Sequence, residues 1–130
     1  MANEPWERMV TEEQRRTLNA ACGDLAKHVR WHGFKLDKDD FRHFLAGTVK
    51  GFRMVPGWDN GDGKRGFVML GASSLTLTKS ECMDAITMAF SLGDDPSSQG
   101  LDIEPIKWSR TVMIARGWSP AMIDEMEAGA

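Results

Sequence analysis

The stretch "TEEQRRTLNAACGDLAKHVRWHG", residues 11–33, decides the fold because it carries the start, the periodicity and the end of a long helix. Thr11 and Gln14 stand at the capping-box spacing, in which each side chain bonds to the backbone N–H of the other residue. No proline follows, and Gly33 supplies a left-handed stop, so we predict a helix that runs to Trp31. Its predicted core face consists of residues at helical spacing: Leu18, Cys22, Leu25, Val29 and then His32.

Polar capping residues predict four further helices. Asp37 opens a helix of about a dozen residues that ends near Gly51 and pairs with the first helix as a helical hairpin. The other predicted helices run from Thr78 to Gly93, from Ser109 to Gly117, and from Ser119 with Pro120 to a frayed C-terminus.

The middle of the chain predicts β-structure. "GFVMLG" (66–71) and "SLTLT" (74–78) read as two short strands, and "VPGWDNGDGKRG" (55–66) before them is a turn-rich loop that carries Trp58. The predicted fold class is therefore α+β: a mostly helical single domain with a small antiparallel β-hairpin between helix pairs. We expect residues 1–10 to be a flexible N-terminus and residues 11–127 to form the single domain.

The composition is that of an ordinary globular protein, with 42% hydrophobic and 27% charged residues among 130. No apolar run approaches the roughly 18 residues needed to cross a bilayer. The N-terminus lacks the pattern of a signal peptide, so we expect a cytoplasmic protein with no membrane contact. Cys22 and Cys82 have no metal-ligand spacing and are predicted to be reduced core thiols.

The charge is unevenly distributed along the chain, although the net charge is only −3. The segment from Gln14 to Arg65 contains eleven Lys or Arg and six Asp, whereas the rest contains five basic and thirteen acidic residues. A solvated surface with no partner is one interpretation, and a basic surface for nucleic acid is the other. The predicted stripe on the first helix consists of Arg16, Asn19, Lys27 and Arg30.

The turn-rich loop combines an aromatic residue with cations. An exposed Trp58 beside Lys64 and Arg65 suits single-stranded nucleic acid, because an indole stacks on any base while cations hold phosphates. Packing of Trp58 onto an apolar patch is the structural alternative. The GxGxxG at 61–66 precedes a strand instead of a helix, so a dinucleotide site is not predicted.

Asp24, His28 and His32 lie at successive i to i+4 spacings, which places two imidazoles on one helical face. The Glu of a catalytic HExxH motif is absent, because Val29 follows His28. We therefore predict no metal and no other cofactor. A metal-dependent nuclease that uses these histidines, His43 or loop carboxylates stays open as an alternative function.

The order of the segments resembles the NinB (Orf) recombination proteins of lambda-type phages, from about Glu12 to Ser109. The resemblance rests on five features in order along the chain: Gln14, "WHG" at 31–33, "VP" at 55–56, "GFVxLG" at 66–71 and "KWS" at 107–109. It implies a non-enzymatic recombination mediator in the host-cell cytoplasm, of phage or prophage origin. Such a protein would be a homodimer that binds single-stranded DNA and the host single-strand-binding protein, and that assists recombinase loading or strand exchange.

The resemblance also implies DNA contacts, position by position. Gln14 matches a family contact, a family Trp falls on Asn19, and a family Arg falls near Thr76 with Lys79 nearby. With the residues chosen on charge and stacking, the predicted DNA-binding set is Gln14, Arg16, Asn19, Lys27, Arg30, Trp58, Lys64, Arg65 and Lys79. A protein adaptor that has lost these DNA contacts is a further alternative.

Relatives in this family carry a strand-rich segment of about forty residues ahead of the first helix, where this sequence has barely a dozen. If that segment helps to form the dimer in relatives, we expect a different interface here. The candidate is the apolar C-terminal segment, with Met113, Ile114, Trp118, Met122 and Ile123.

Overall fold

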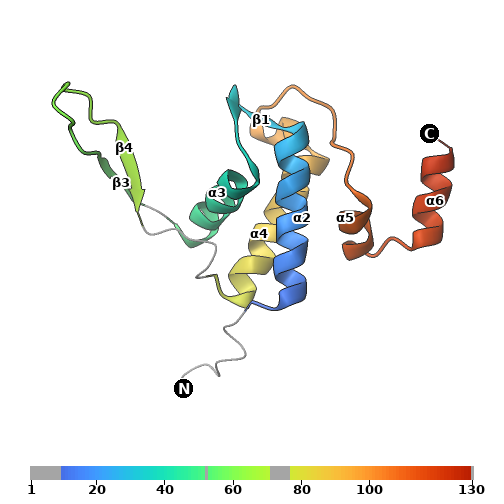
Figure 1. Cartoon of the computed structure of the whole chain (residues 1–130). Coiled ribbons are helices and arrows are strands. Elements are labelled where there is room, and N and C mark those ends of the chain that lie inside the picture. The colour runs from blue at the N-terminus through green and yellow to red at the C-terminus, as the bar shows by residue number, and fades with distance from the viewer. Residues whose placement is uncertain (1–9, 52, 71–76, 130) are drawn as a thin grey trace, which may run out of the picture.

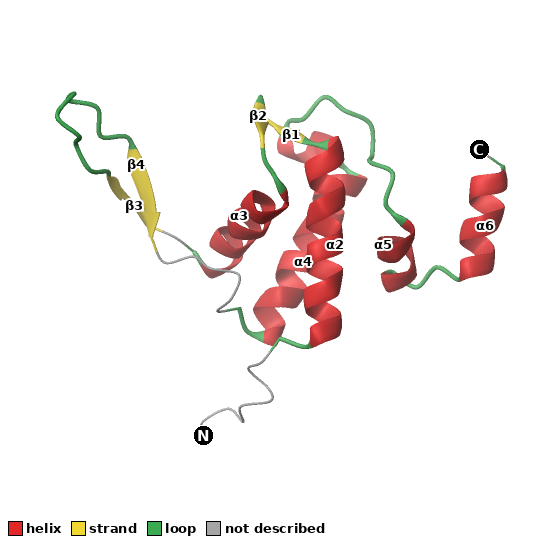
Figure 2. Ribbon diagram, in the orientation of Figure 1, coloured by secondary structure: helices red, strands yellow, loops and turns green. Residues whose placement is uncertain are grey.

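The computed structural model describes residues 10–51, 53–70 and 77–129 (Figure 1). Helices make up most of this part of the chain, and the strands form two short antiparallel pairs (Figure 2), which confirms the predicted α+β class. The elements in chain order are α2 (Glu12–His28), β1 (Arg30–Trp31), β2 (Phe34–Lys35), α3 (Lys38–Lys50), β3 (Arg53–Pro56), β4 (Phe67–Leu70), α4 (Lys79–Asp94), the 3-10 helix η2 (Pro96–Gln99), α5 (Arg110–Ala115) and α6 (Pro120–Ala128).

The core lies where α2, α3 and α4 pack against one another. The predicted α2 stripe of Leu18, Cys22, Leu25 and Val29 is buried there, as are Phe41 and Leu45 of α3. Both cysteines are buried and free, as predicted. Burial raises the pKa of the Cys22 thiol to about 12, so this thiol stays protonated at neutral pH.

Three capping boxes fix where the core helices begin. Thr11, Asp37 and Thr78 each accept a hydrogen bond from the backbone N–H three residues later, at 3.1, 2.8 and 3.1 Å. In each case the side chain at that third position returns a bond to the capping residue, which satisfies two otherwise unpaired N–H groups. These helix starts agree with the sequence prediction.

The first helix ends earlier than predicted, at His28 instead of Trp31. Val29 is already extended, and Arg30–Trp31 pairs with Phe34–Lys35 across a turn at His32 and Gly33. Both turn residues have positive φ, 47° and 90°, which is the conformation that a two-residue hairpin turn requires. His32 is therefore an exposed turn residue and not part of the core stripe.

The second hairpin also differs from the prediction. β4 lies where "GFVMLG" was expected to form a strand, but its partner is β3, which includes Val55 and Pro56, the first two residues of the predicted loop. In the predicted second strand, residues 74–76 lie outside the described part of the chain. Leu77 and Thr78 are not in a strand, because Thr78 is the N-cap of α4. The loop at 57–66 therefore forms the tip of a hairpin that extends away from the helices (Figure 1).

The C-terminal segment contacts the helical core near Asp24 and near Gly93. The backbone N–H of Ser109 donates to the buried Asp24 carboxylate of α2 at 2.7 Å, while the Ser109 side chain makes no capping bond to α5. Trp108 packs so closely over Gly93 that a Cβ at this position would overlap its ring. These contacts place α5 beside α2, with α6 beyond it at the edge of the molecule (Figure 1).

The ion pair between Arg116 and Asp94, the residue after Gly93, leads to a prediction about the pH dependence of stability. Arg116 donates to both carboxylate oxygens of Asp94, at 2.9 and 2.8 Å, and this holds the pKa of Asp94 below its ordinary value. Because the folded-state pKa is the lower one, the stabilisation is present above the unfolded-state pKa of about 4 and is lost as the pH falls through the folded-state pKa.

Replacing Arg116 by Gln should therefore reduce the free energy of unfolding most at neutral pH, and the difference from wild type should shrink towards pH 3. Urea unfolding followed by circular dichroism at several pH values measures this difference. Lys107→Gln is the control, with no pH-dependent difference expected. A constant difference for Arg116→Gln across the whole range would contradict the role assigned to the ion pair.

Candidate nucleic-acid interface

The β1–β2 hairpin separates its side chains by charge and by aromatic character. Arg30 and Lys35 are direct cross-strand partners, so their side chains stand on one face of the hairpin. Trp31 and Phe34 form the next pair, and because successive strand residues alternate, they stand on the opposite face. A single short turn at the end of α2 thus presents cations on one side and aromatic rings on the other.

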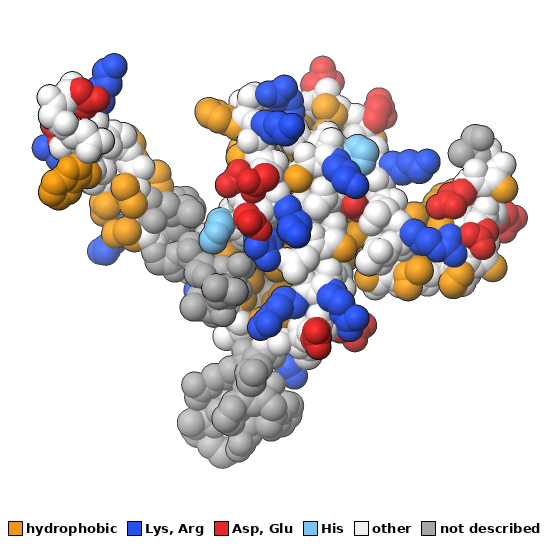
Figure 3. Space-filling model, in the orientation of Figure 1, with side chains coloured by type: hydrophobic (Ala, Val, Ile, Leu, Met, Phe, Trp, Pro, Cys, Tyr) orange, Lys and Arg blue, Asp and Glu red, His pale blue; other side chains and the backbone are white. Residues whose placement is uncertain are grey.

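The cationic face borders an open hollow formed by the end of α2, the hairpin and the start of α3. Four cations line it, Lys27, Arg30, Lys35 and Lys38, with Asp37 as the acidic residue among them. All four cations are exposed. Lys and Arg side chains are also visible over α2 and up to the β1–β2 end of the molecule in Figure 3. The hollow therefore has a surplus of positive charge that can hold successive phosphates.

The aromatic face carries rings at different depths. The Trp31 ring lies 4.8 Å from that of Phe44 in α3 and 4.6 Å from that of His32. Phe34 stands out into solvent, with 69% of its surface exposed. Trp31, Phe34 and Phe44 line a second open hollow together with His43. Exposed rings beside a cationic surface are the features that single-strand binding proteins combine.

The β3–β4 hairpin carries the other predicted aromatic residue at its tip. Trp58 is 83% exposed, so it does not fold back over an apolar patch. The Asp59 carboxylate accepts hydrogen bonds from the N–H groups of Gly61 and Gly63, at 2.8 and 3.2 Å, which shapes the loop. Lys64 and Arg65 follow on the same exposed tip, as the sequence predicted, and the hairpin extends away from the helices (Figure 1).

The remaining predicted residues have individual surroundings. Gln14 is half-buried and bonds to Thr11, and its amide lies 3.5 Å from the carbonyl oxygen of Lys79. The Asn19 side chain accepts a hydrogen bond from Arg42 at 2.9 Å. Arg16 is exposed on α2, and it shares a helical face with Lys27, since eleven residues make about three turns. Thr76 lies outside the described residues.

The predicted basic stripe does not lie on one helix, because α2 ends at His28 and Arg30 belongs to β1. The structure brings Lys27 and Arg30 to the same hollow but adds two cations that sequence reasoning missed, Lys35 and Lys38. Recognising His32–Gly33 as a hairpin turn would have paired Lys35 with Arg30.

The histidine spacing does not assemble a metal site. Within residues 10–51, 53–70 and 77–129, no three His, Cys, Asp or Glu side chains come together closely enough to hold a metal ion. Asp24 is instead buried and bonded to the backbone of Ser109. His32 belongs to the turn after β1, so it does not continue the face of α2 that carries His28.

Comparison with models of known protein families gives one match that covers most of the chain. The family model described as "NinB protein" matches residues 4–96, which is well over half of the sequence. The chain belongs to the NinB family. The match includes both hairpins and helices α2 to α4, so the cationic hollow and the aromatic face lie within the NinB region.

Known NinB proteins of phages and prophages resemble the chain at similar levels. The P21 prophage-derived NinB of Escherichia coli O6:H1 is 27% identical over 112 residues, which cover 86% of this chain and 68% of that protein. NinB of Escherichia phage lambda is 26% identical over 112 residues with the same coverage. NinB of Salmonella phage P22 is 27% identical over 109 residues, 84% of this chain and 67% of that protein.

A solved structure titled "Structural Genomics, NinB" has the same fold, with a TM-score of 0.56 and 22% identity over 86% of this chain and 81% of that one. Separately, no helix in the described part of the chain is long and apolar enough to span a bilayer.

Proposed function

We propose that this NinB-family protein binds single-stranded DNA during phage recombination and assists recombinase loading or strand exchange. Family membership supports the coarse part of this proposal, a phage protein connected with recombination. The observation that carries the DNA-binding part is the β1–β2 hairpin, which presents Arg30 and Lys35 on one face and Trp31 and Phe34 on the other.

The mechanism we propose is electrostatic and independent of base sequence. Lys27, Arg30, Lys35 and Lys38 replace the counterions that surround successive phosphates, and the release of these ions drives binding. The rings on the opposite face of the hairpin then stack on bases, which only an unpaired strand can offer freely. Preference for single strands over duplex DNA follows from this second contact.

The β3–β4 hairpin adds a second contact in this proposal. Trp58, Lys64 and Arg65 at its tip combine a ring with cations, as the two faces of the β1–β2 hairpin together do. A strand that contacts the rings of the β1–β2 hairpin and also reaches this tip would be extended between two stacking points, a form in which its bases are open to a recombinase.

A homodimer is part of the proposal, with an interface at the C-terminal helices. Four exposed apolar side chains support it: Ile114, Trp118, Met122 and Met126. Ile123, considered for the same role on sequence grounds, is already fully buried within the chain. Sedimentation equilibrium of the wild type and of the double variant Trp118→Gln with Met122→Gln tests this part. We expect the wild type to be a dimer and the double variant to be a monomer. A monomeric wild type would exclude the homodimer.

We also propose that the protein acts in the cytoplasm of the host cell. The test of its function has two stages. Labelled single-stranded and duplex oligonucleotides are titrated with the protein, and the single strand should bind more tightly. Recombinase is then added to a strand coated with host single-strand-binding protein, with and without this protein, and filament growth should be faster with it. Equal growth rates would remove the mediator role, and tighter duplex binding would remove the single-strand preference.

A further inference from the structure

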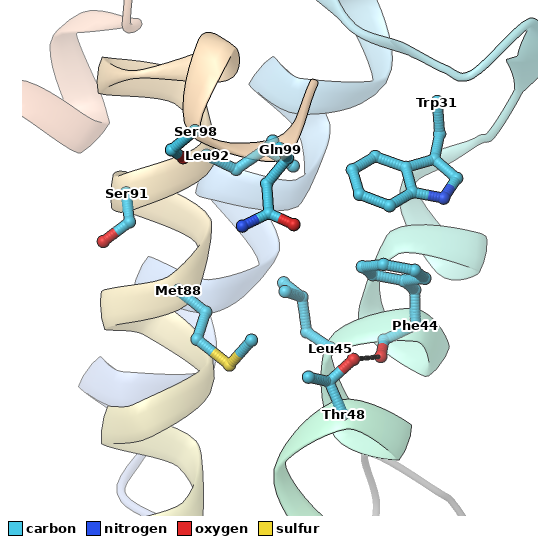
Figure 4. A pocket seen from close by; sticks show the side chains of 9 residues that line it. All are labelled: Trp31, Phe44, Leu45, Thr48, Met88, Ser91, Leu92, Ser98 and Gln99. Carbon is cyan, nitrogen blue, oxygen red and sulfur yellow. Dashed lines mark hydrogen bonds between the residues drawn. The ribbon is translucent and has the colours of Figure 1, made fainter. Parts of the chain in front are cut away.

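A pocket opens between α3, α4 and η2, beside the aromatic face of the β1–β2 hairpin (Figure 4). Trp31 and Phe44 form one wall, and Leu45, Met88 and Leu92 supply further apolar surface. The remaining lining residues are polar: Thr48, Ser91, Ser98 and Gln99. The cations that line the hollow on the other face of the hairpin do not line this pocket, and the two sites share no lining residue.

The pocket has the size of one ring. Its volume is about 180 Å³. An apolar protein cavity of about 150 Å³ is large enough to bind benzene. A planar group of one ring therefore fits, and the neighbouring rings of Trp31 and Phe44 offer it an aromatic wall. A larger group would have to remain partly outside.

Gln99 gives the pocket a free polar group. Its amide projects from η2 towards the middle of the pocket, across from the Trp31 and Phe44 rings (Figure 4). Neither the amide nor the Ser91 hydroxyl has a hydrogen-bond partner among the described residues. The hydroxyls of Thr48 and Ser98 differ, because each already donates to a nearby backbone carbonyl, at 2.8 Å in both cases.

We propose that this pocket takes one unstacked base of single-stranded nucleic acid, with the base against Trp31 and Phe44 and its edge bonded to the Gln99 amide. A base edge presents both hydrogen-bond donors and acceptors, and an amide side chain matches it with one of each. The inference rests on the proposed function, since the hollow with Arg30 and Lys35 would hold phosphates of the strand that carries the inserted base.

A base fits these surroundings better than an aromatic side chain of a protein partner. A phenyl ring in the pocket would shield the Gln99 amide from water without offering it a hydrogen bond, which is unfavourable. The neighbouring open hollow shares Trp31, Phe44 and Thr48 with the pocket and adds the exposed Phe34. The next base of the strand has a stacking surface there, so the strand can continue past the pocket.

The test separates contacts to bases from contacts to phosphates. The 130-residue chain is titrated, by fluorescence anisotropy, into labelled oligothymidylate of about 12 nucleotides, within usual site sizes, and into an abasic strand of equal length and charge. Wild type should bind the abasic strand more weakly. Gln99→Leu should weaken oligothymidylate binding about 3- to 10-fold, the range of one hydrogen bond, and should leave abasic binding unchanged.

Two further variants keep the result interpretable. Trp31→Leu should weaken oligothymidylate binding about 5-fold or more, as loss of a stacking contact does, and circular dichroism checks that this half-buried position still permits folding. Ser97→Ala, on η2 but outside the pocket, should bind as wild type does. Gln99 is exposed, so Gln99→Leu tests the pocket even if Trp31→Leu fails to fold.

Three outcomes would overturn the inference. Equal affinity for both strands, unaffected by Gln99→Leu, would exclude the base pocket while the DNA-binding function stands. Absence of binding to either strand at about 50 mM salt, where electrostatic contacts are strong, would exclude both. Binding of N-acetylphenylalaninamide that oligothymidylate does not displace would identify the ligand as a protein side chain.

Discussion

Replacing Phe41 by Ala should lower the free energy of unfolding by about 3–5 kcal/mol, the usual cost of truncating a buried phenylalanine. Phe41 lies in α3 and is fully buried, in the core that α2, α3 and α4 share. The substitution removes its contacts and leaves a cavity that surrounding helices fill only in part. Because a domain is stable by only about 5–15 kcal/mol, this variant should be close to unfolding at 37 °C.

Phe34→Ala is the matched control, since it makes the same chemical change at a site that is 69% exposed. Its cost should stay below about 1 kcal/mol, the range of one cross-strand pair. Urea unfolding followed by circular dichroism measures both values. Equal destabilisation by the two substitutions would contradict the placement of the core between the three helices.

Replacing Lys27 and Arg30 together by Gln should weaken single-stranded DNA binding by about 25-fold at 0.1 M salt. Each phosphate contact contributes about 0.7 to the slope of log affinity against log salt. Two contacts therefore supply about 1.4 log units of the affinity that is gained when salt falls from 1 M to 0.1 M, and the variant loses this gain. The two side chains are exposed and line one hollow, so the fold should be retained. Anisotropy at several salt concentrations gives both the affinity and the slope.

The control removes the same net charge elsewhere. Lys107→Gln with Arg110→Gln alters two exposed cations that do not line the cationic hollow. Among the described residues, the ion pair that it removes is the exposed one between Arg110 and Asp124, which contributes little to stability. This variant should bind nearly as wild type does. An equal loss in both variants would mean that overall charge, and not the hollow, determines affinity.

The helical framework was predictable because its signals are local. Capping boxes at Thr11, Asp37 and Thr78 mark helix starts within four residues, and apolar spacing marks the buried faces. The end of α2 was missed because Val29 and His32 continue the helical spacing, so periodicity favoured a longer helix. The competing signal was the His32–Gly33 pair, where both residues adopt positive φ.

The candidate site was predictable only in part, because it depends on pairing between distant or irregular segments. Lys27 and Arg30 were identified from their charge and helical spacing, whereas Lys35 joins them only through its register with Arg30 in the hairpin. Trp31 and Gln99 are far apart in the sequence and line one pocket because η2 packs at the end of α4. No spacing rule in a single sequence predicts that two such residues share a pocket.

The most direct test of the central claim is the salt dependence of single-stranded DNA binding by the wild-type protein. If the four cations of the hollow each neutralise one phosphate, the slope of log affinity against log salt should be about −2.8, or steeper if the tip of the β3–β4 hairpin also contacts the strand. Tight binding near 50 mM salt that declines in this way is the predicted result. A slope near zero, or no binding at about 50 mM salt, would contradict the account.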